Sequence, residues 1–279
     1  MLLRDATVGI VGLGLMGGSL GLALDGKVAR RLGADVDEAA ATRAVAGGAI
    51  DEAMTEAQLA ARADLVVLAI PVRRMLERIP VIAEQLRDGA ILTDVGSTKS
   101  DICAAFDVLP ERISAIGGHP MCGREVSGID AADGTLYVGA RWVLVPTQRT
   151  DHLADALVGE LVQAVGADVI EARREDHDRA VATASHLAYV SAQALVGSLG
   201  NADGVTDGLA GHLAATGFAG ATRLAGGNVD VWLDILLTNR EHVRESIGLF
   251  SAQLADFAAL LDDEESLRRV LEAGRVANA

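Results

Sequence analysis

The chain has 279 residues, of which half are hydrophobic, 23% are charged and only 3% are aromatic. This length is typical of two domains, and the apolar content excludes wholesale disorder. The net charge of −15 argues against binding to nucleic acid or to an anionic membrane, because both need a basic face. Cys103 and Cys122 provide neither a disulfide framework nor metal-ligand spacing, which favours a reducing, cytoplasmic compartment and no bound metal.

The first part of the chain alternates between short apolar runs and helical stretches. Strands are expected at 7–12, 31–36, 64–70, 90–94, 113–117, 142–145 and 168–170. Helices are expected from the glycine-rich turn to residue 24 and at 38–47, 73–86, 100–106 and 151–165, with Pro80 marking a break or a new start. This alternation predicts an α/β fold with a Rossmann-type, doubly wound parallel sheet.

From about Arg173 the strand signals stop, and helical sequence runs to the end of the chain. Asn228 is the expected N-cap of one helix over 229–261. We therefore expect a dinucleotide-binding domain over residues 1–172 and an all-helical substrate-binding and dimerisation domain over 173–279.

Two uncharged stretches, 6–24 and 180–202, have nearly the length of a membrane span. The first contains six glycines, and the second contains seven polar side chains, so neither is expected to cross a membrane. The second stretch is instead too apolar to face water on a monomer, which predicts a homodimer.

The first expected strand runs into Gly12-x-Gly14-x-x-Gly17, which opens a helix. Gly12 permits a tight turn, Gly14 lets the backbone approach a pyrophosphate, and Gly17 lets the helix pack closely on the strand. Asp35 ends the second strand, where a carboxylate accepts a hydrogen bond from a ribose 2′-hydroxyl and repels a 2′-phosphate. The motif therefore predicts NAD rather than NADP, with Asp37 as a weaker candidate for the role of Asp35. The other expected cofactor contacts are Leu15, Met16, Ile70 and Pro71.

Two further segments follow strands at the carboxyl edge of the expected sheet, where open parallel sheets bind ligands. In GSTK at 96–99, Ser97 either contacts a substrate hydroxyl or a catalytic base, or caps the next helix. In GGHPMCG at 117–123, the glycines should leave His119 exposed at a strand end. A histidine with a pKa near neutrality can take a proton from an alcohol during oxidation, so His119 is the expected general base.

Arg223 follows a run without charged residues at 208–222 in the helical half. A cation beside so apolar a segment is expected to be partly buried and therefore to need an anion. That anion is either a substrate carboxylate or an acidic side chain of the protein, and the local sequence favours the internal pair.

Over about residues 7–258 the sequence resembles the prephenate/arogenate dehydrogenases. The matching stretches are VGIVGLGLMGGSLGLAL, DVGSTKSDI, GGHPMCGREVSGIDAA, REDHDRAVATASHL and ATRLAGGNVDVWLDILLTNR. The resemblance implies a dinucleotide-binding domain followed by a helical domain that dimerises. It also implies NAD-dependent oxidation of the ring alcohol of prephenate or arogenate, with loss of the ring carboxylate as CO2.

The resemblance implies roles for particular residues. His119 is implied to bind the ring hydroxyl as the catalytic group, and Ser97 is implied to support that contact. Arg223 is implied to bind the ring carboxylate, which reverses the local preference for an internal pair. Glu125 and Trp232 are implied to line the pocket.

One departure from the family concerns SHLAY at 185–189. The family often has SHLPH here, so Tyr189 replaces a histidine that faces the substrate, and His186 is retained as a substrate-binding candidate. This position bears on the side chain that distinguishes prephenate, a keto acid, from arogenate, an amino acid. The predicted reaction is conversion of prephenate to 4-hydroxyphenylpyruvate in tyrosine biosynthesis, with arogenate oxidation to tyrosine as the alternative.

Two other functions compete with this prediction. The β-hydroxyacid dehydrogenases share the GLGxMG opening and a helical second domain, but they use a lysine of the helical domain as the catalytic group. This chain has no lysine after Lys99. A non-catalytic NAD-binding sensor is the other alternative, and it would need no positioned base.

Overall fold

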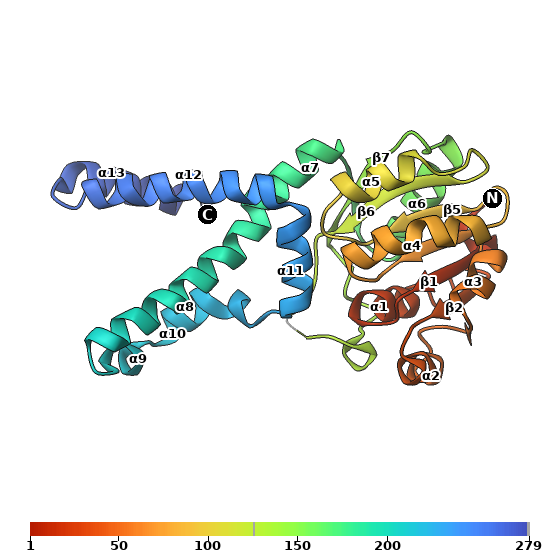
Figure 1. The fold of residues 1–279 in the computed structure, drawn as a ribbon, viewed down its shortest axis with the longest axis horizontal. Coiled ribbons are helices and arrows are strands. Elements are labelled where there is room, and N and C mark those ends of the chain that lie inside the picture. The colour runs from red at the N-terminus through yellow and green to blue at the C-terminus, as the bar shows by residue number, and fades with distance from the viewer. Residues whose placement is uncertain (125, 278–279) are drawn as a thin grey trace.

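The structure, a computed structural model, describes residues 1–124 and 126–277. Figure 1 shows a sheet flanked by helices at one end of the molecule and an assembly of helices at the other. The strands are β1 (Thr7–Val11), β2 (Arg30–Ala34), β3 (Glu52–Ala53), β4 (Leu65–Leu68), β5 (Ile91–Asp94), β6 (Ser114–Pro120), β7 (Arg141–Pro146) and β8 (Asp168–Glu171). They form one sheet in the order β3-β2-β1-β4-β5-β6-β7-β8, so the chain reverses its direction of winding between β1 and β4, as in a doubly wound fold.

The sheet differs from the prediction in two places. The pairing of β6 with β7 is antiparallel, whereas the other neighbouring strands are parallel. Among its described residues, the connection from β6 to β7 contains only a 3-10 turn at Ile129–Ala131 and no crossover helix that would make β7 run parallel. Sequence reasoning also missed β3 and the helix that follows it, because β3 has only two residues and neither is buried.

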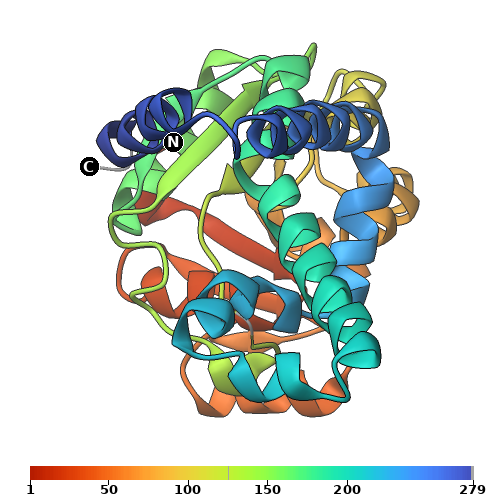
Figure 2. The same cartoon turned by 90° about the vertical axis from the view of Figure 1, so that its left-hand side faces the viewer.

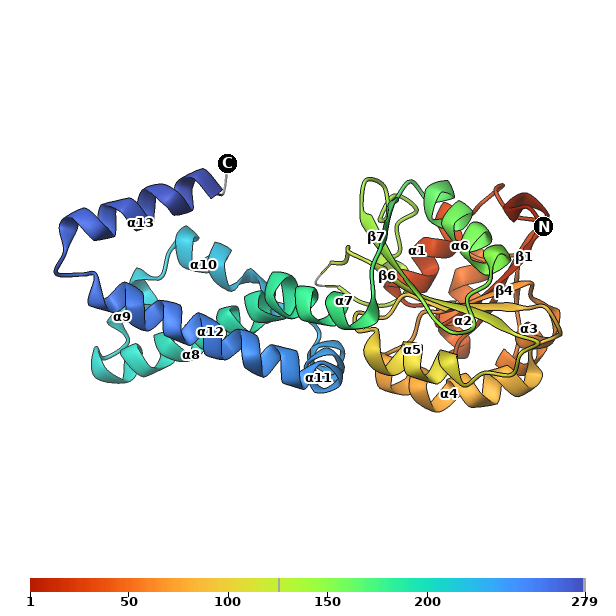
Figure 3. The ribbon, with the colours of Figure 1, turned by 90° about the horizontal axis from the view of Figure 1, so that it is seen from above.

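Six α-helices cover the two faces of the sheet. They are α1 (Leu15–Ala23), α2 (Glu38–Ala46), α3 (Glu56–Arg62), α4 (Val72–Gln85), α5 (Ser100–Asp107) and α6 (His152–Ala164). Buried side chains of α1, α2 and α6 form the core on one face, and those of α3, α4 and α5 form the core on the other. Figure 3 shows α1 and α6 on one side of the sheet and α4 and α5 on the other. The predicted break at Pro80 is wrong: α4 continues through it, because Pro80 lies on the exposed face while Met75, Ile79 and Ile82 are buried.

The second part of the molecule contains only helices among its described residues. They are α7 (Arg174–Val181), a π-helical turn (Ala182–His186), α8 (Leu187–Val205), α9 (Leu209–Leu213), α10 (Thr216–Thr222), a 3-10 turn (Arg223–Gly226), α11 (Val229–Thr238), α12 (Arg240–Ala259) and α13 (Glu264–Ala277). Seen from the helical end, α8 runs obliquely across the molecule, and α13 lies to one side of α12 (Figure 2). None of the described residues of α13 is buried.

The helix expected over 229–261 is two helices. Asn228 is the N-cap as predicted, since its side chain accepts hydrogen bonds from the backbone N–H groups of Asp230 and Val231. The helix nevertheless ends at Thr238, and α12 starts in a new direction after Asn239, whose φ is −123° and ψ is 27°. Asn239 is buried, and its Nδ2 donates to the backbone oxygen of Asp178 at 2.7 Å. A long-range contact of this kind leaves no pattern in the local sequence.

The helical part packs on the carboxyl edge of the sheet. Thr98, after β5, lies 2.9 Å from Thr238 of α11 between their hydroxyl oxygens. The backbone N–H of Arg73, at the start of α4, donates to Asp234 of α11 at 3.2 Å. Both contacts lie where the strands end, so the two parts meet at the edge that binds ligands in open α/β sheets.

Residues 1–124 and 126–277 contain neither a membrane-spanning helix nor a cluster of metal-binding side chains. None of the described helices combines the length and apolar character needed to cross a membrane. Within the same residues, no group of three or more His, Cys, Asp or Glu side chains is placed to hold a metal ion.

The glycines of the first turn give a matched pair of variants. A Cβ at Gly17 would clash with the carbonyl oxygen of Gly12, whereas a Cβ at Gly14 has no atom within 4 Å. Overpacking costs about 1–3 kcal/mol, so Gly17→Ala should lower the melting temperature by about 3–10 °C. Gly14→Ala should leave it nearly unchanged. Equal melting temperatures of the two variants, measured by calorimetry, would contradict this packing.

Candidate active site

The glycine-rich turn between β1 and α1 has the geometry that a dinucleotide needs. Gly12 adopts a φ of +94°, and a side chain there would collide with the backbone oxygen of Ala69. The space around Gly14 is open, and no side chain caps the first turn of α1. Backbone N–H groups at such a helix start are available to phosphate oxygens.

Asp35 directly follows β2 and lies against this turn. Its Oδ2 accepts a hydrogen bond from the backbone N–H of Leu13 at 2.6 Å, and its Oδ1 accepts one from that of Asp37 at 2.8 Å. Asp37 itself caps α2 by accepting from Ala39 at 2.9 Å. The structure therefore places Asp35 beside the candidate phosphate turn and gives Asp37 a local structural role.

The other predicted cofactor residues surround the same turn. Leu15 is buried in α1, and the backbone oxygen of Met16 accepts a hydrogen bond from Tyr137 at 2.7 Å. Ile70 packs against Gly12, since a Cβ on that glycine would lie 2.6 Å from the Ile70 Cγ2. Pro71 is exposed and precedes α4. These residues follow β1 and β4, the neighbouring strands between which the winding of the chain reverses.

A buried ion pair holds the strand that carries His119. Lys99 and Asp94 are both completely buried, and the Lys99 Nζ bonds to the Asp94 carboxylate. The Nζ also donates to the backbone oxygen of Gly118 at 2.7 Å, while Asp94 Oδ1 accepts from the N–H of Gly118 at 3.0 Å. The residue before His119 is thus fixed through both of its backbone polar groups. Sequence reasoning gave this pair no role, although Lys99 is one of only two lysines.

His119 begins a chain of buried hydrogen bonds. Its Nδ1 lies 2.8 Å from the Nε2 of His177 in α7, and the two rings meet nearly edge-on at 72°. The Nδ1 of His177 lies 2.8 Å from the Oδ1 of Asp178. The Asp178 carboxylate also accepts from the backbone N–H groups of Lys99 at 2.7 Å and Ser100 at 2.8 Å. Neither His177 nor Asp178 was assigned a role from the sequence, although both lie in a family stretch.

Two expectations for His119 are wrong. Its side chain is buried rather than exposed, with 7% of its surface accessible. Burial lowers the pKa of His119 well below 6.5, and the neighbouring His177, Lys99 and His186 lower it further. The reason is that His119 lies inside β6 and not after its end, with α7 packed over it.

The electrostatics of Asp178 are opposite to those of His119. Burial on its own would raise the pKa of this carboxyl, but hydrogen bonds from His177, Ser100 and Lys99 outweigh that effect and bring the pKa to about 2. Asp178 is therefore a carboxylate at neutral pH, and it can only accept hydrogen bonds.

Ser97 is half-buried in the turn after β5. The alternative that it caps the next helix is wrong, because α5 begins at Ser100 and the residue at its N-cap is Lys99. The N–H groups of Lys99 and Ser100, at the start of α5, donate to the carboxylate of Asp178 in α7. The helix therefore needs no cap from its own side chains.

Three predicted substrate residues are brought together by the π-helical turn, α8 and α11. The rings of Tyr189 and Trp232 stack with centroids 3.9 Å apart, and His186 meets Trp232 edge-on at 6.3 Å. Gln193 donates to the Tyr189 hydroxyl at 2.9 Å. Burial lowers the pKa of His186 to about 4, and its Nδ1 lies 3.2 Å from the Asn239 amide nitrogen. The result is an aromatic cluster with one neutral imidazole.

Arg223 opens the 3-10 turn that leads into α11. The expectation that it is partly buried is wrong for the single chain, where its side chain is exposed. The preceding helices α9 and α10 bury no residue, so this apolar run provides no interior beside Arg223. Glu125, the other predicted polar pocket residue, lies outside the described residues.

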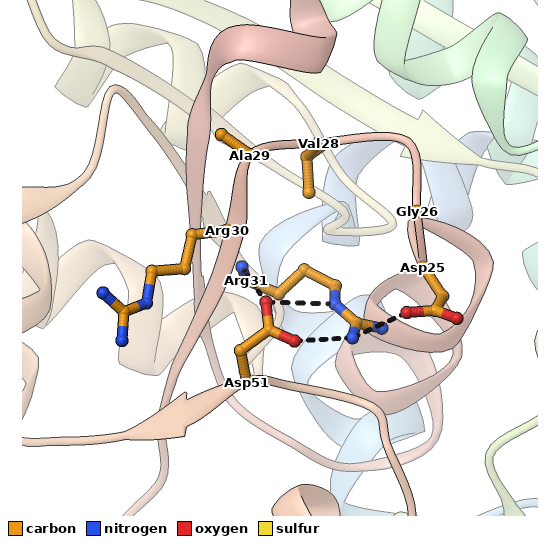
Figure 4. Close-up of a pocket in the computed structure, with 7 residues that line it drawn as sticks. All are labelled: Asp25, Gly26, Val28, Ala29, Arg30, Arg31 and Asp51. Atoms are coloured by element: carbon orange, nitrogen blue, oxygen red, sulfur yellow. Dashed lines mark hydrogen bonds and ion pairs between the residues drawn. The ribbon is translucent and has the colours of Figure 1, made fainter.

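A surface pocket of about 470 Å³ lies at the opposite, amino edge of the sheet (Figure 4). Its central side chain, Arg31, is bonded to Asp51 at 2.7 Å and to Asp25 at 2.8 Å. Arg31 also donates to the backbone oxygens of Gly21 and Gly48. Arg31 is therefore bonded within the protein. The pocket lies at the end of the sheet where the strands begin, whereas the residues described above lie where the strands end. We therefore assign Arg31 a structural role.

The two lysines give a second matched pair. Lys99→Met should lower the free energy of unfolding by about 3–5 kcal/mol, because the Asp94 carboxylate would stay buried without its partner. Lys27, which is exposed and donates to Ala164, is the control, and Lys27→Met should cost less than about 1 kcal/mol. Denaturant unfolding measures both, and similar small losses would show that the ion pair does not support β6.

Comparisons with known proteins agree on one family. The nucleotide-binding domain model of prephenate dehydrogenase matches residues 20–171, and the dimerization domain model matches residues 173–273. Prephenate dehydrogenase of Bacillus subtilis is 32% identical over 93% of this chain and 71% of its own length. The structure of A. aeolicus prephenate dehydrogenase in complex with hydroxyphenyl propionate and NAD+ has a TM-score of 0.87 at 30% identity, covering 98% of this chain and 96% of that one. Synechocystis arogenate dehydrogenase has a TM-score of 0.85 at 30% identity, covering 98% of both chains. The chain belongs to the prephenate dehydrogenase family.

Proposed function

We propose that the chain catalyses the NAD-dependent oxidative decarboxylation of prephenate to 4-hydroxyphenylpyruvate, a step of tyrosine biosynthesis. The observation that carries this proposal is the position of His119. It is a buried imidazole at the edge where the dinucleotide turn and the helical part meet. Among the described residues only its Nδ1 has a hydrogen-bond partner, which leaves Nε2 for a substrate. The likeness to the prephenate dehydrogenases supports the choice of substrate.

The residues around the first turn fit NAD. Gly12, Gly14 and Gly17 would hold the pyrophosphate against the start of α1, and Asp35 would bind the ribose hydroxyls. NAD held by these residues would supply the hydride acceptor for the carbon that carries the ring hydroxyl. The likeness to a family structure that contains NAD+ supports this cofactor.

His119 and Ser97 are proposed to act on the ring hydroxyl of the substrate. Neutral His119 takes the proton of the ring hydroxyl at Nε2, and Ser97 supports this contact. As the ring carbonyl forms, the electrons of the breaking C–CO2 bond flow into the ring, which becomes aromatic. Because aromatisation drives the step, the protein needs mainly to position the substrate and to provide the base. A well-placed base contributes about 10²–10⁴-fold in rate.

The substrate's carboxylates need cations in a chain whose net charge is −15. Arg223 is the proposed partner of the ring carboxylate, and Glu125 is proposed to line the pocket. The cluster of His186, Tyr189 and Trp232 is proposed to form the pocket wall. Tyr189 faces the part of the substrate that differs between prephenate and arogenate, so arogenate remains the alternative substrate. The likeness to an arogenate dehydrogenase also supports arogenate as the alternative substrate.

The proposal includes a cytoplasmic homodimer with domains divided at residues 172 and 173. The match of the dimerization domain model supports the dimer, as do the exposed apolar side chains of the helical part, among them Leu195, Val205, Leu213, Leu249 and Leu254. Both cysteines are free, which suits a reducing compartment. The acidic surface argues against nucleic-acid and membrane partners.

The direct test of the function is a steady-state comparison of prephenate and arogenate with the wild-type enzyme, and of both with the His119→Asn variant. We expect prephenate to give the higher kcat/KM. His119→Asn should lower kcat by roughly 10²-fold or more and leave the KM for NAD nearly unchanged. Near-normal kcat in the variant would remove His119 from the mechanism, and higher kcat/KM with arogenate would reassign the substrate.

The pH profile tests the environment of His119. Burial holds its pKa well below 6.5, so the imidazole is already neutral at pH 6.5 and gains nothing as the pH rises further. We therefore expect kcat to stay nearly constant between pH 6.5 and 8. A rise of about twofold from pH 6.5 to pH 8 would mean that the base titrates like an exposed histidine, which is half protonated at pH 6.5 and nearly all neutral at pH 8.

Cofactor choice depends on Asp35. A 2′-phosphate would lie against this carboxylate, and like charges in contact typically cost several kcal/mol, so NAD should give the higher kcat/KM. Asp35→Ser should narrow the difference between NAD and NADP. Asp37→Ser is the matched control, because Asp37 caps α2 and should not change the ratio. Equal kcat/KM values for NAD and NADP with the wild-type enzyme would overturn this assignment.

A further inference from the structure

The hydrogen bonds behind His119 determine which of its nitrogens carries the proton. Asp178 is a carboxylate that accepts three N–H groups, so His177 must hold its own proton on Nδ1 to donate to it at 2.8 Å. When the His177 ring carries this one proton, its Nε2 is a lone pair and can only accept. His119 must therefore carry its proton on Nδ1, which places the lone pair of His119 on Nε2.

The same arrangement stabilises the positive charge that protonation would create on His119. A proton taken by His119 at Nε2 would create a cation in a buried site near the Lys99 ammonium. His177 lies between His119 and Asp178, with 2.8 Å on each side. If the Nδ1 proton of His119 moves to the Nε2 of His177, the positive charge lies next to the Asp178 carboxylate.

We propose that His177 and Asp178 are positioning residues for His119, and that His177 takes the Nδ1 proton of His119 when the substrate protonates its Nε2. This inference rests on the proposed function and adds the identity of the groups behind the base. The substrate O–H bond breaks as the His119 Nε2–H bond forms. The His119 Nδ1–H bond breaks as the His177 Nε2–H bond forms. No electron is gained or lost in this transfer, which ends in a buried imidazolium–carboxylate pair.

The surroundings favour this direction of transfer. Lys99, before α5, and His186, in the π-helical turn, both disfavour charge on His119. The Asp94 carboxylate is paired with Lys99 and accepts hydrogen bonds from the backbone N–H groups of Gly96 and Gly118. Asp178 is the carboxylate in direct contact with the histidine pair. Asp178 is also held within the helical part, because Asn239 of the α11–α12 junction donates to its backbone oxygen.

The first test reads the tautomer directly and needs neither cofactor nor substrate. The chain has six histidines, so ¹⁵N imidazole spectra of the full-length protein are simple enough to assign, with His119→Asn identifying the His119 signals. We expect neutral His119 with its proton on Nδ1 and neutral His177 with its proton on Nδ1. A proton on Nε2 of neutral His119 in the wild-type protein would overturn the inference.

The second test separates holding the tautomer from taking the proton. In His177→Gln the amide oxygen can accept from His119 Nδ1 and the amide nitrogen can donate to Asp178, but the side chain cannot take up a proton. His177→Leu can do neither. We expect His177→Gln to retain the Nδ1–H tautomer of His119 yet to lower kcat by roughly 10²-fold, and His177→Leu to lose the tautomer as well. The KM for NAD should stay within about twofold in both variants.

A histidine outside the site provides the control. His152 is exposed at the start of α6, and His152→Gln should leave kcat and the His119 spectrum unchanged. A wild-type kcat in His177→Gln would show that His177 only fills space or holds the tautomer of His119. That result would overturn the proposed proton transfer. If His177→Leu does not fold, the wild-type spectrum and His177→Gln still decide. Failure of the proposed function would appear as inactivity of the wild-type enzyme toward prephenate and arogenate, and it would leave the spectra unaffected.

Discussion

The arrangement of this molecule depends on the buried carboxylate of Asp178. A carboxylate in the interior must be compensated, and here the compensation comes from both parts of the chain: two backbone N–H groups at the start of α5 and the imidazole of His177 in α7. One anion therefore caps a helix of the sheet domain, orients the imidazole next to the base and fixes the junction between the two parts. The break between α11 and α12 belongs to the same constraint, because Asn239 leaves the helix to bond the Asp178 backbone.

A buried ion pair, Lys99 with Asp94, fixes the backbone next to the base, while Asp178 and His177 orient its ring. Lys99 and Asp94 bind the two polar groups of Gly118, so His119 has little freedom in position or in orientation. Such preorganisation is what a base needs when the chemical step is driven by aromatisation. The Lys99 ammonium is neutralised by Asp94 inside the protein and does not face a substrate. An anionic substrate must then be attracted by other cations, which is the role proposed for Arg223 on the helical side of the site.

Sequence reasoning succeeded where the determinants are local. The turn at Gly12 requires a positive φ, the cap at Asn228 requires a side-chain acceptor, and strands such as β4 are continuous apolar runs. It failed where contacts over long sequence distances decide. The contact between His119 and His177 spans 58 residues, and burial, followed by the neighbouring His177, lowers the pKa of the base. The adjacent His177 and Asp178 lay in a recognised stretch, but only the fold shows that they lie behind the catalytic strand.

The central claim is that His119 and His177 act as one unit, and a double-mutant cycle on kcat tests it most directly. The cycle compares the wild-type enzyme, His119→Asn, His177→Gln and the double variant under the same conditions. If His177 acts only through His119, its loss has no further effect once His119 is gone, so the double variant should have a kcat within about threefold of His119→Asn alone. A double variant whose kcat falls by the product of the two single losses would mean that the two histidines act independently, and it would contradict this account.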